Sequence, residues 1–285
     1  ANVDALVAAL SISSTRLQGQ VVDRLGALRA ARALPALLAT LSDPSKKVRA
    51  KALRAVSGLQ TLDSLPGLLS AMRETEDPAW ARKLFAAVLK MNHADTAPLA
   101  MGFLGSPEDF VAARVVKRAL PDLQHTAARI LGRFGRKDAV SALIPLLGSS
   151  KKAVRMAAHD ALLRSTNQRV DGRALKSSSA RRRSKTLKRW RGFLAKHKAD
   201  TWLQWMRLGF EARGIRFRGK MASRAGVETL IKHIRHRDDI VGDNAIRVLS
   251  VLTEHYVDPR WRNPRNNQRH WRHWWAANQD TCPLE

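Results

Sequence analysis

Apolar residues recur at spacings of three and four along the first 166 residues of this chain. The clearest runs are Leu34, Leu37, Leu38 and Leu41, followed by Val48, Ala52, Leu53 and Val56. This spacing places apolar side chains on one face of a helix. Ala and Leu dominate and β-branched runs are scarce, which favours helix over strand. The pattern predicts a series of amphipathic helices from about residue 3 to residue 166.

Polar loops separate these predicted helices at regular intervals. Ser42-Asp43-Pro44-Ser45 supplies an N-cap for the helix that carries Val48, and Gly148-Ser149-Ser150 occupies the same place in a later copy. Glu76-Asp77-Pro78 and Gly105-Ser106-Pro107 serve the intervening helices. The chain therefore alternates a helix, a polar loop, a second helix and a short glycine turn.

Residues 21–57 and 127–163 carry the same pattern. A shift of 106 places Leu25-Gly26 on Leu131-Gly132 and Val48-Arg49 on Val154-Arg155. This shift equals about three periods of roughly 35 residues, which is typical of helical-repeat arrays. Such arrays stack helix pairs over a continuous core and offer an extended surface to a partner. We therefore expect the function to depend on surface chemistry.

The repeated motif resembles the HEAT-repeat superfamily. The residues that carry the resemblance are Leu34-Pro35-Ala36-Leu37-Leu38, Asp43-Pro44 and Val48-Arg49, with a weaker copy in Ala142-Leu143-Ile144-Pro145-Leu146-Leu147 and Val154-Arg155. The resemblance covers residues 1–166 and, more loosely, 222–257. It implies an all-α fold, a right-handed α-solenoid of HEAT-like helix pairs.

A second repetition lies in the C-terminal part. Trp190-Arg191-Gly192-Phe193-Leu194 and Trp271-Arg272-His273-Trp274-Trp275 each follow a polar, basic linker. The later copy is similar to the Trp-x-x-Trp-Trp tail of many bacterial HEAT-repeat proteins, and the earlier copy departs from it at Phe193 and Leu194. We predict four segments: a HEAT-like array (1–166), a basic linker with a first Trp helix (167–198), a smaller HEAT-like module (199–257), and a basic linker with a C-terminal capping helix (258–285).

Most of the tryptophans are predicted to pack in the core, because they lie at helical spacings among Leu and Phe. This group comprises Trp190, Trp202, Trp205, Trp271, Trp274 and Trp275. Trp80 is expected on the second helix of its repeat. Trp261 lies in a polar linker and is the candidate exposed aromatic.

The charge balance points to a polyanionic partner. The chain has 51 Lys and Arg against 24 Asp and Glu, a formal net charge of +27. Such a field attracts nucleic acid, an anionic membrane surface or an acidic protein. Residues 173–224 contain seventeen Lys and Arg but only two acidic residues, Asp200 and Glu211. Within this segment, Arg181-Arg182-Arg183 resemble a flexible arm. We therefore predict that replacing these three arginines by Ala leaves thermal stability nearly unchanged. The candidate phosphate contacts are Lys46, Lys47, Arg49, Lys151, Lys152, Arg155, Arg181, Arg182, Arg183, Lys185, Lys188, Arg189 and Arg191.

The sequence gives little support to a catalytic or metal site. His233 and His236, and His270 and His273, have the spacing of two ligands on one helix face, but no Cys or carboxylate completes either pair. No phosphate-binding glycine loop occurs, and the single Cys282 excludes a disulfide framework. We expect no cofactor and no metal.

Three HEAT-fold enzyme families are compared with the chain. HEAT-fold hydroxylases use His-Glu pairs, and no His-Glu dipeptide occurs here. Bilin lyases share HEAT-like repeats, but no residue of the chain identifies a bilin site. HEAT-like alkylpurine DNA glycosylases combine a basic face with an aromatic and an acidic residue, for which Asp109, Asp122 and Asp138 are present without a matching motif.

The preferred hypothesis is a non-enzymatic scaffold that binds a polyanion, with nucleic acid favoured and no sequence read. The alternative is an adaptor for an acidic protein, and the third is a DNA glycosylase. The chain starts at Ala1 and ends in Leu284-Glu285, which is typical of a removed leader or of cloning. The compartment stays open: the cytoplasm for a nucleic-acid partner, the periplasm or exterior if a leader was removed. The oligomeric state stays open too.

Overall fold

A computed structural model describes residues 2–11, 14–91, 93–257, 263–282 and 284. The chain forms two compact units, Ala1–Ile130 and Leu131–Glu285. Every regular element in the described residues is an α-helix or a short 3-10 helix, so the predicted all-α class is confirmed. The compact units divide at residue 130, inside a helix, whereas the predicted segments divide at 166. The four-segment organisation stays a prediction based on the sequence repeats.

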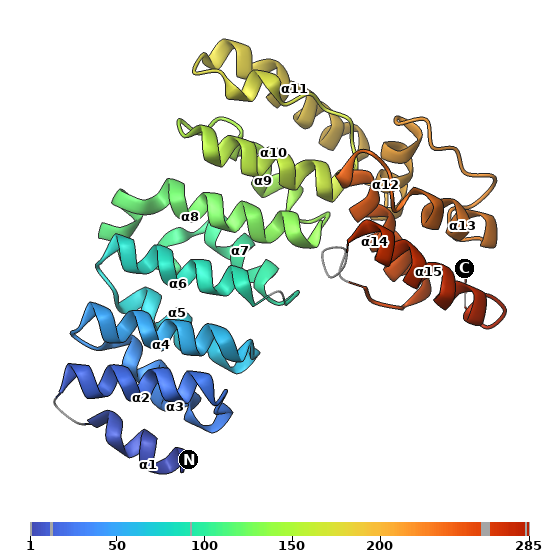
Figure 1. Ribbon diagram of the computed structural model, residues 1–285. Coiled ribbons are helices and arrows are strands. Elements are labelled where there is room, and N and C mark those ends of the chain that lie inside the picture. Colours follow the sequence, from blue (N-terminus) through green and yellow to red (C-terminus); the bar gives the residue numbers. More distant parts are fainter. Residues whose placement is uncertain (1, 12–13, 92, 258–262, 283, 285) are drawn as a thin grey trace. The chain divides into compact units, whose positions relative to one another are not determined.

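The first unit alternates shorter and longer helices. They are α1 (Val3–Ala8), α2 (Thr15–Ala27), α3 (Leu34–Ala39), α4 (Lys46–Leu59), α5 (Leu65–Glu74), α6 (Pro78–Lys90), α7 (Thr96–Gly105) and most of α8 (Ala113–Phe134). The longer helices α2, α4 and α6 lie side by side in order, and α3 packs against both α4 and α5 (Figure 1). This is the stack of helix pairs that the hydrophobic pattern predicts.

Polar caps begin the longer helices of this unit. The side chains of Ser14, Ser45 and Asp77 accept hydrogen bonds from backbone N–H groups at the starts of α2, α4 and α6. These bonds satisfy donors that have no partner within the helix. The loop residues that were read as helix breaks in the sequence therefore fix where the next helix starts.

A close helix approach explains part of the 106-residue repetition. A Cβ added at Gly26 would lie 3.0 Å from the Cβ of Ala55, and one added at Gly132 would lie 3.0 Å from the Cα of Ala161. Both pairs are related by the same shift. Glycine therefore recurs where the neighbouring helix leaves little room for a larger residue.

The second unit contains the rest of the helices. They are α9 (Val140–Leu146), α10 (Lys152–Thr166), α11 (Ala180–His197), α12 (Trp202–Glu211), α13 (Arg224–His233), α14 (Asp239–Thr253) and α15 (Pro264–Asn278). The predicted packing of the tryptophans is confirmed here. Trp190, Trp205 and Trp271 are fully buried and Trp275 is 5% exposed. Trp202 and Trp274 pack partly buried against the core of α12 to α15. Trp261 lies outside the described residues.

The predicted flexible arm is wrong. Residues 181–183 form the first turn of α11, an 18-residue helix whose N-cap is Ser179. The Ser179 hydroxyl accepts a hydrogen bond from the Arg182 N–H at 3.5 Å. A capped start and the buried side chains of Thr186 and Trp190 hold this basic segment as a helix.

Two further helix boundaries differ from the sequence-based expectation. The module predicted to begin at residue 199 has its first helix from Trp202, because Thr201 and Gln204 form a reciprocal capping box that starts α12 there. His236 lies beyond the end of α13, so it does not share a helix with His233. Within the described part of the chain, no helix is long and apolar enough to cross a membrane.

Candidate functional site

Three of the predicted phosphate contacts share one structural role. Arg49, Arg155 and Arg183 are each the fourth residue of their helix. In each case the guanidinium Nη1 donates hydrogen bonds to the backbone carbonyls six and five residues earlier, in the loop that precedes the helix. We call this arrangement the loop clamp. It ties the polar loop to the helix that follows it.

The loop clamp of Arg155 is buried. Its Nη1 donates to the carbonyls of Ser149 and Ser150, both at 2.8 Å. Its Nε donates to the Leu175 carbonyl at 2.7 Å, and its Nη2 donates to the Ser177 carbonyl at 3.1 Å. Arg155 is only 2% exposed, so the prediction that it contacts phosphate is wrong. Its side chain is part of the fold.

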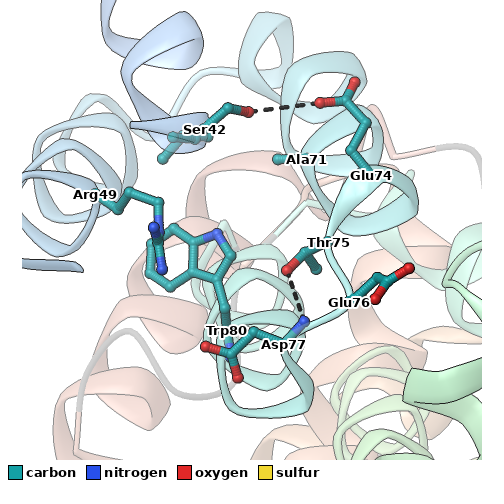
Figure 2. Close-up of a pocket in the computed structure, with 9 residues that line it drawn as sticks. Ser42, Arg49, Ala71, Glu74, Thr75, Glu76, Asp77 and Trp80 are labelled. Carbon is teal, nitrogen blue, oxygen red and sulfur yellow. Dashed lines mark hydrogen bonds between the residues drawn. The ribbon is translucent and has the colours of Figure 1, made fainter. Parts of the chain in front are cut away.

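The other two loop clamps are partly covered. The guanidinium of Arg49 also lies over the Trp80 ring, 5.3 Å from its centroid (Figure 2).

Burial, followed by the nearby charge of Arg183, lowers the pKa of Arg155. These three arginines are held by the protein itself, so they contribute charge to the surface but few free donors.

The remaining predicted residues are exposed. Lys46 and Lys47 open α4 in the first unit, and Lys151 and Lys152 lie at the start of α10 in the second. The two lysine pairs belong to different compact units, and their role as phosphate contacts stays a prediction. The predicted contacts on α11 that are exposed are Arg181, Arg182, Lys185, Lys188, Arg189 and Arg191.

One face of α11 is anchored in an aromatic cluster. The Trp190 indole N–H donates to His159 Nδ1 at 3.3 Å, and Phe193 lies edge-on to Trp190 and Trp205. Burial lowers the pKa of His159, which keeps Nδ1 free to accept that bond. Since Trp190 is fully buried, the helix is fixed and its opposite face turns to solvent.

That opposite face is rich in basic residues. The sequence of α11 contains no Asp or Glu. Among the residues that the structure describes, no carboxylate lies within ion-pair distance of the six exposed basic side chains listed above for α11. We call this the α11 basic face. Arg181, Lys185 and Lys188 follow each other at the spacing of one helix face.

Two of the three carboxylates considered for a glycosylase have other partners. Asp122 accepts a hydrogen bond from Arg82 at 2.6 Å, and Asp138 accepts one from Arg136 Nε at 2.9 Å. The hydrogen bond from Arg136 holds the pKa of Asp138 below its usual value. Asp109 is exposed, in a 3-10 turn after α7. No catalytic arrangement follows from these contacts.

A cavity of about 480 Å³ in the first unit brings Asp77 and Trp80 together (Figure 2). Asp77 accepts from the backbone N–H groups of Ala79 at 2.9 Å and Trp80 at 3.3 Å. Burial raises the pKa of Asp77, but these bonds and the charges of Lys46 and Arg49 outweigh it, so the net pKa is lowered. Trp80 is 6% exposed beneath Arg49. The carboxylate therefore caps a helix, and the ring packs in the fold.

The histidines form pairs and no larger cluster in the described residues. His255 Nε2 lies 3.0 Å from His270 Nε2, and the His255 ring stacks on Trp274 with centroids 4.6 Å apart. His233 Nδ1 lies 2.8 Å from the Thr229 carbonyl. Of the pairs predicted from spacing, the rings of His233 and His236 lie near each other, with centroids 6.3 Å apart. His270, which was predicted to pair with His273, instead contacts His255.

The stacked helix pairs agree with one family model. A model of HEAT repeats matches residues 3–90 and 108–190. The chain belongs to the HEAT-repeat family. The matched ranges end at Trp190, so they include the first half of α11 and its basic residues up to Arg189.

Two solved structures are similar to this HEAT-repeat protein at low identity. The structure of the complex of CpcE and CpcF of phycocyanin lyase from Nostoc sp. PCC7120 is 18% identical, with a TM-score of 0.43 over 96% of this chain and 94% of that chain. A crystal structure of an engineered protein is 14% identical, with a TM-score of 0.37 over 89% of this chain and 99% of that chain. No curated protein matches the chain.

Proposed function

We propose that this HEAT-repeat protein is a non-enzymatic scaffold that binds nucleic acid through its phosphates, without reading base sequence. The observation that carries the proposal is the α11 basic face. It combines six exposed Lys and Arg side chains, none of them paired with a carboxylate in the described residues, on a helix fixed by buried aromatics.

The chemistry of this face fits a regular polyanion. Lys and Arg that contact phosphates release condensed counterions, and this release drives binding that weakens with salt. Contacts to phosphates position a protein on nucleic acid but carry no sequence information. Because α11 is already folded before binding, only its exposed side chains, and not its own backbone, lose conformational entropy when they contact the phosphates. Lys46 and Lys47 on α4, and Lys151 and Lys152 on α10, are expected to add contacts.

The experiment compares two variants that lose the same charge. Arg181→Gln, Lys185→Gln and Lys188→Gln together neutralise one stripe of the α11 basic face. The matched control, Arg235→Gln, Arg237→Gln and Arg265→Gln, removes three exposed charges elsewhere in the second unit. Binding to random-sequence duplex DNA is measured by fluorescence anisotropy at about 100 mM salt.

The proposal predicts that the α11 variant loses about tenfold or more in affinity while the control changes by less than about threefold. Equal losses in both variants would show a diffuse charge effect and contradict a defined face. Weak DNA binding by the wild type, together with tight binding of an acidic protein such as a poly-glutamate-rich partner, would replace nucleic acid by the adaptor function.

A further inference from the structure

A hollow beside the α11 basic face gathers four arginines of the second unit. Its volume is about 380 Å³. The charged residues that line it are Arg169, Arg173, Arg189, Arg213, Asp171 and Asp238. We call it the arginine hollow. Arg189 comes from α11, Arg213 follows α12, and Asp238 caps α14, so residues far apart in the sequence meet here.

Both carboxylates of the arginine hollow are already engaged. Asp171 accepts from the backbone N–H of Arg173 at 2.8 Å and from its Nε at 2.9 Å. Asp238 accepts from the Ile240 N–H at 3.1 Å and from Arg213 Nε at 3.2 Å. Each Asp is therefore neutralised by one arginine, and two of the four arginine charges stay uncompensated.

Arg213 builds the wall of the hollow. Its side chain is 7% exposed. Its guanidinium donates to the carbonyls of Asn167, Gly209 and Gln168, in addition to its ion pair with Asp238. Since these bonds use its Nε and both terminal nitrogens, Arg213 holds the loop and offers little to a ligand.

The uncompensated charges belong to Arg169 and Arg189. Both side chains are exposed, and in the described part of the chain no carboxylate lies within ion-pair distance of either. The loop that carries Arg169 is fixed beforehand. Asn167 Nδ2 donates to the Met206 carbonyl at 3.2 Å, and Gln168 Nε2 donates to the Trp205 carbonyl at 3.1 Å. Two guanidiniums on fixed elements therefore line one small hollow.

We propose that the arginine hollow binds a single phosphate group between Arg169 and Arg189. Planar guanidiniums bind phosphate oxygens through paired N–H donors, which gives geometry as well as charge. Arg173, whose side chain is 88% exposed, supplies a third guanidinium at the rim. Leu163, Val170 and Ile240 line the rest of the hollow and strengthen these contacts by displacing water. The inference rests on the proposed function, because Arg189 belongs to the α11 basic face.

The phosphate comes either from a nucleic-acid backbone or from a free phosphate or phosphomonoester. The experiment follows the arginine Nε–Hε signals of the ¹⁵N-labelled full chain by NMR while inorganic phosphate, and separately a short random-sequence duplex oligonucleotide, is added. The hollow variant is Arg169→Gln with Arg189→Gln. The control variant, Arg181→Gln with Lys188→Gln, removes two charges from the same basic face outside the hollow.

The expected result is that phosphate shifts the Arg169 and Arg189 signals and leaves the Arg181 and Arg182 signals in place. The hollow variant is expected to lose at least about tenfold more oligonucleotide affinity than the control variant. If inorganic phosphate shifts the signals but the oligonucleotide does not bind, the arginine hollow is a site for free phosphate, and the proposed nucleic-acid binding is contradicted. Oligonucleotide binding that both variants weaken equally, with no shift from phosphate, would overturn the hollow and leave the proposed function standing.

Discussion

The buried loop clamp of Arg155 allows a sharp test of structure against charge. Replacing Arg155 by Met keeps a long side chain but removes four hydrogen bonds. The carbonyls of Ser149, Ser150 and Leu175 then lose this donor, and the carbonyl of Ser177 keeps only its bond from Arg183. The Leu175 bond is buried, and a hydrogen bond to a charged group contributes about 1.5–3 kcal/mol. The other three carbonyls are part-buried and reach water, so we assign them about 0.5–1 kcal/mol each.

The sum predicts that Arg155→Met lowers the free energy of unfolding by about 4 kcal/mol. For a unit of this size, the melting temperature falls by about 2–4 °C per kcal/mol, and therefore by about 8–16 °C. Thermal and urea unfolding followed by circular dichroism measure both quantities. Arg155→Lys keeps the charge but not the forked donor geometry, so its loss is expected to be intermediate.

The matched control uses two exposed neighbours, Lys151→Met and Lys152→Met. These changes are expected to alter stability by less than about 0.5 kcal/mol each, and to weaken DNA binding. The reasoning would be refuted if Arg155→Met changed stability by less than about 1 kcal/mol, or if it weakened DNA binding of the folded protein as much as the lysine variants do.

The remaining predictions concern the first turn of α11, the packing of helices around glycines, and the pH dependence of stability. Arg183→Ala is expected to destabilise the protein by about 1–2 kcal/mol, because its loop clamp is lost. Arg181→Ala and Arg182→Ala are expected to change stability by less than about 0.5 kcal/mol. Equal effects of all three substitutions in urea unfolding would contradict the clamp. Gly209→Ala places a Cβ against the Asn167 carbonyl and is expected to lower the free energy of unfolding by about 1–3 kcal/mol. Gly192→Ala, whose Cβ would meet nothing within 4 Å, is expected to raise it by up to about 1 kcal/mol. Similar melting temperatures for the two variants would contradict the close contact at Gly209. Burial lowers the pKa of His159 and of His255, so the unfolded chain binds more protons than the folded chain at mildly acidic pH. Stability is therefore expected to fall as the pH drops below 6.5, the ordinary pKa of histidine, and His159→Gln is expected to reduce that fall. A urea midpoint that does not change between about pH 7 and pH 5 would contradict this reasoning.

Much of the fold was predictable because local signals agreed with one another. Apolar spacing, the caps at Ser45 and Asp77, and the repeated glycines Gly26 and Gly132 all encode stacked helix pairs. The first turn of α11 was mistaken for an arm, because a run of arginines has no apolar periodicity of its own. The buried Thr186 and Trp190, four residues apart, were the signal that a helix lies there.

The candidate site was only partly predictable. Charge alone does not separate a surface arginine from a buried one, so Arg155 was grouped with Lys151 and Lys152. A signal was available in the repeat, since Arg49 and Arg155 hold the same place after a polar loop. The arginine hollow could not be found from sequence spacing, because Arg169 and Asp238 meet only through the packing of several helices.

The most direct measurement of the central claim is the affinity of the full chain for random-sequence duplex DNA from about 50 to 300 mM salt. Each phosphate neutralised contributes about −0.9 to the slope of log affinity against log salt. The account predicts a slope of several units with tight binding at low salt, and a slope shallower by about two to three units when Arg181, Lys185 and Lys188 are neutralised. Weak binding at the lowest salt, or an unchanged slope in that variant, would contradict it.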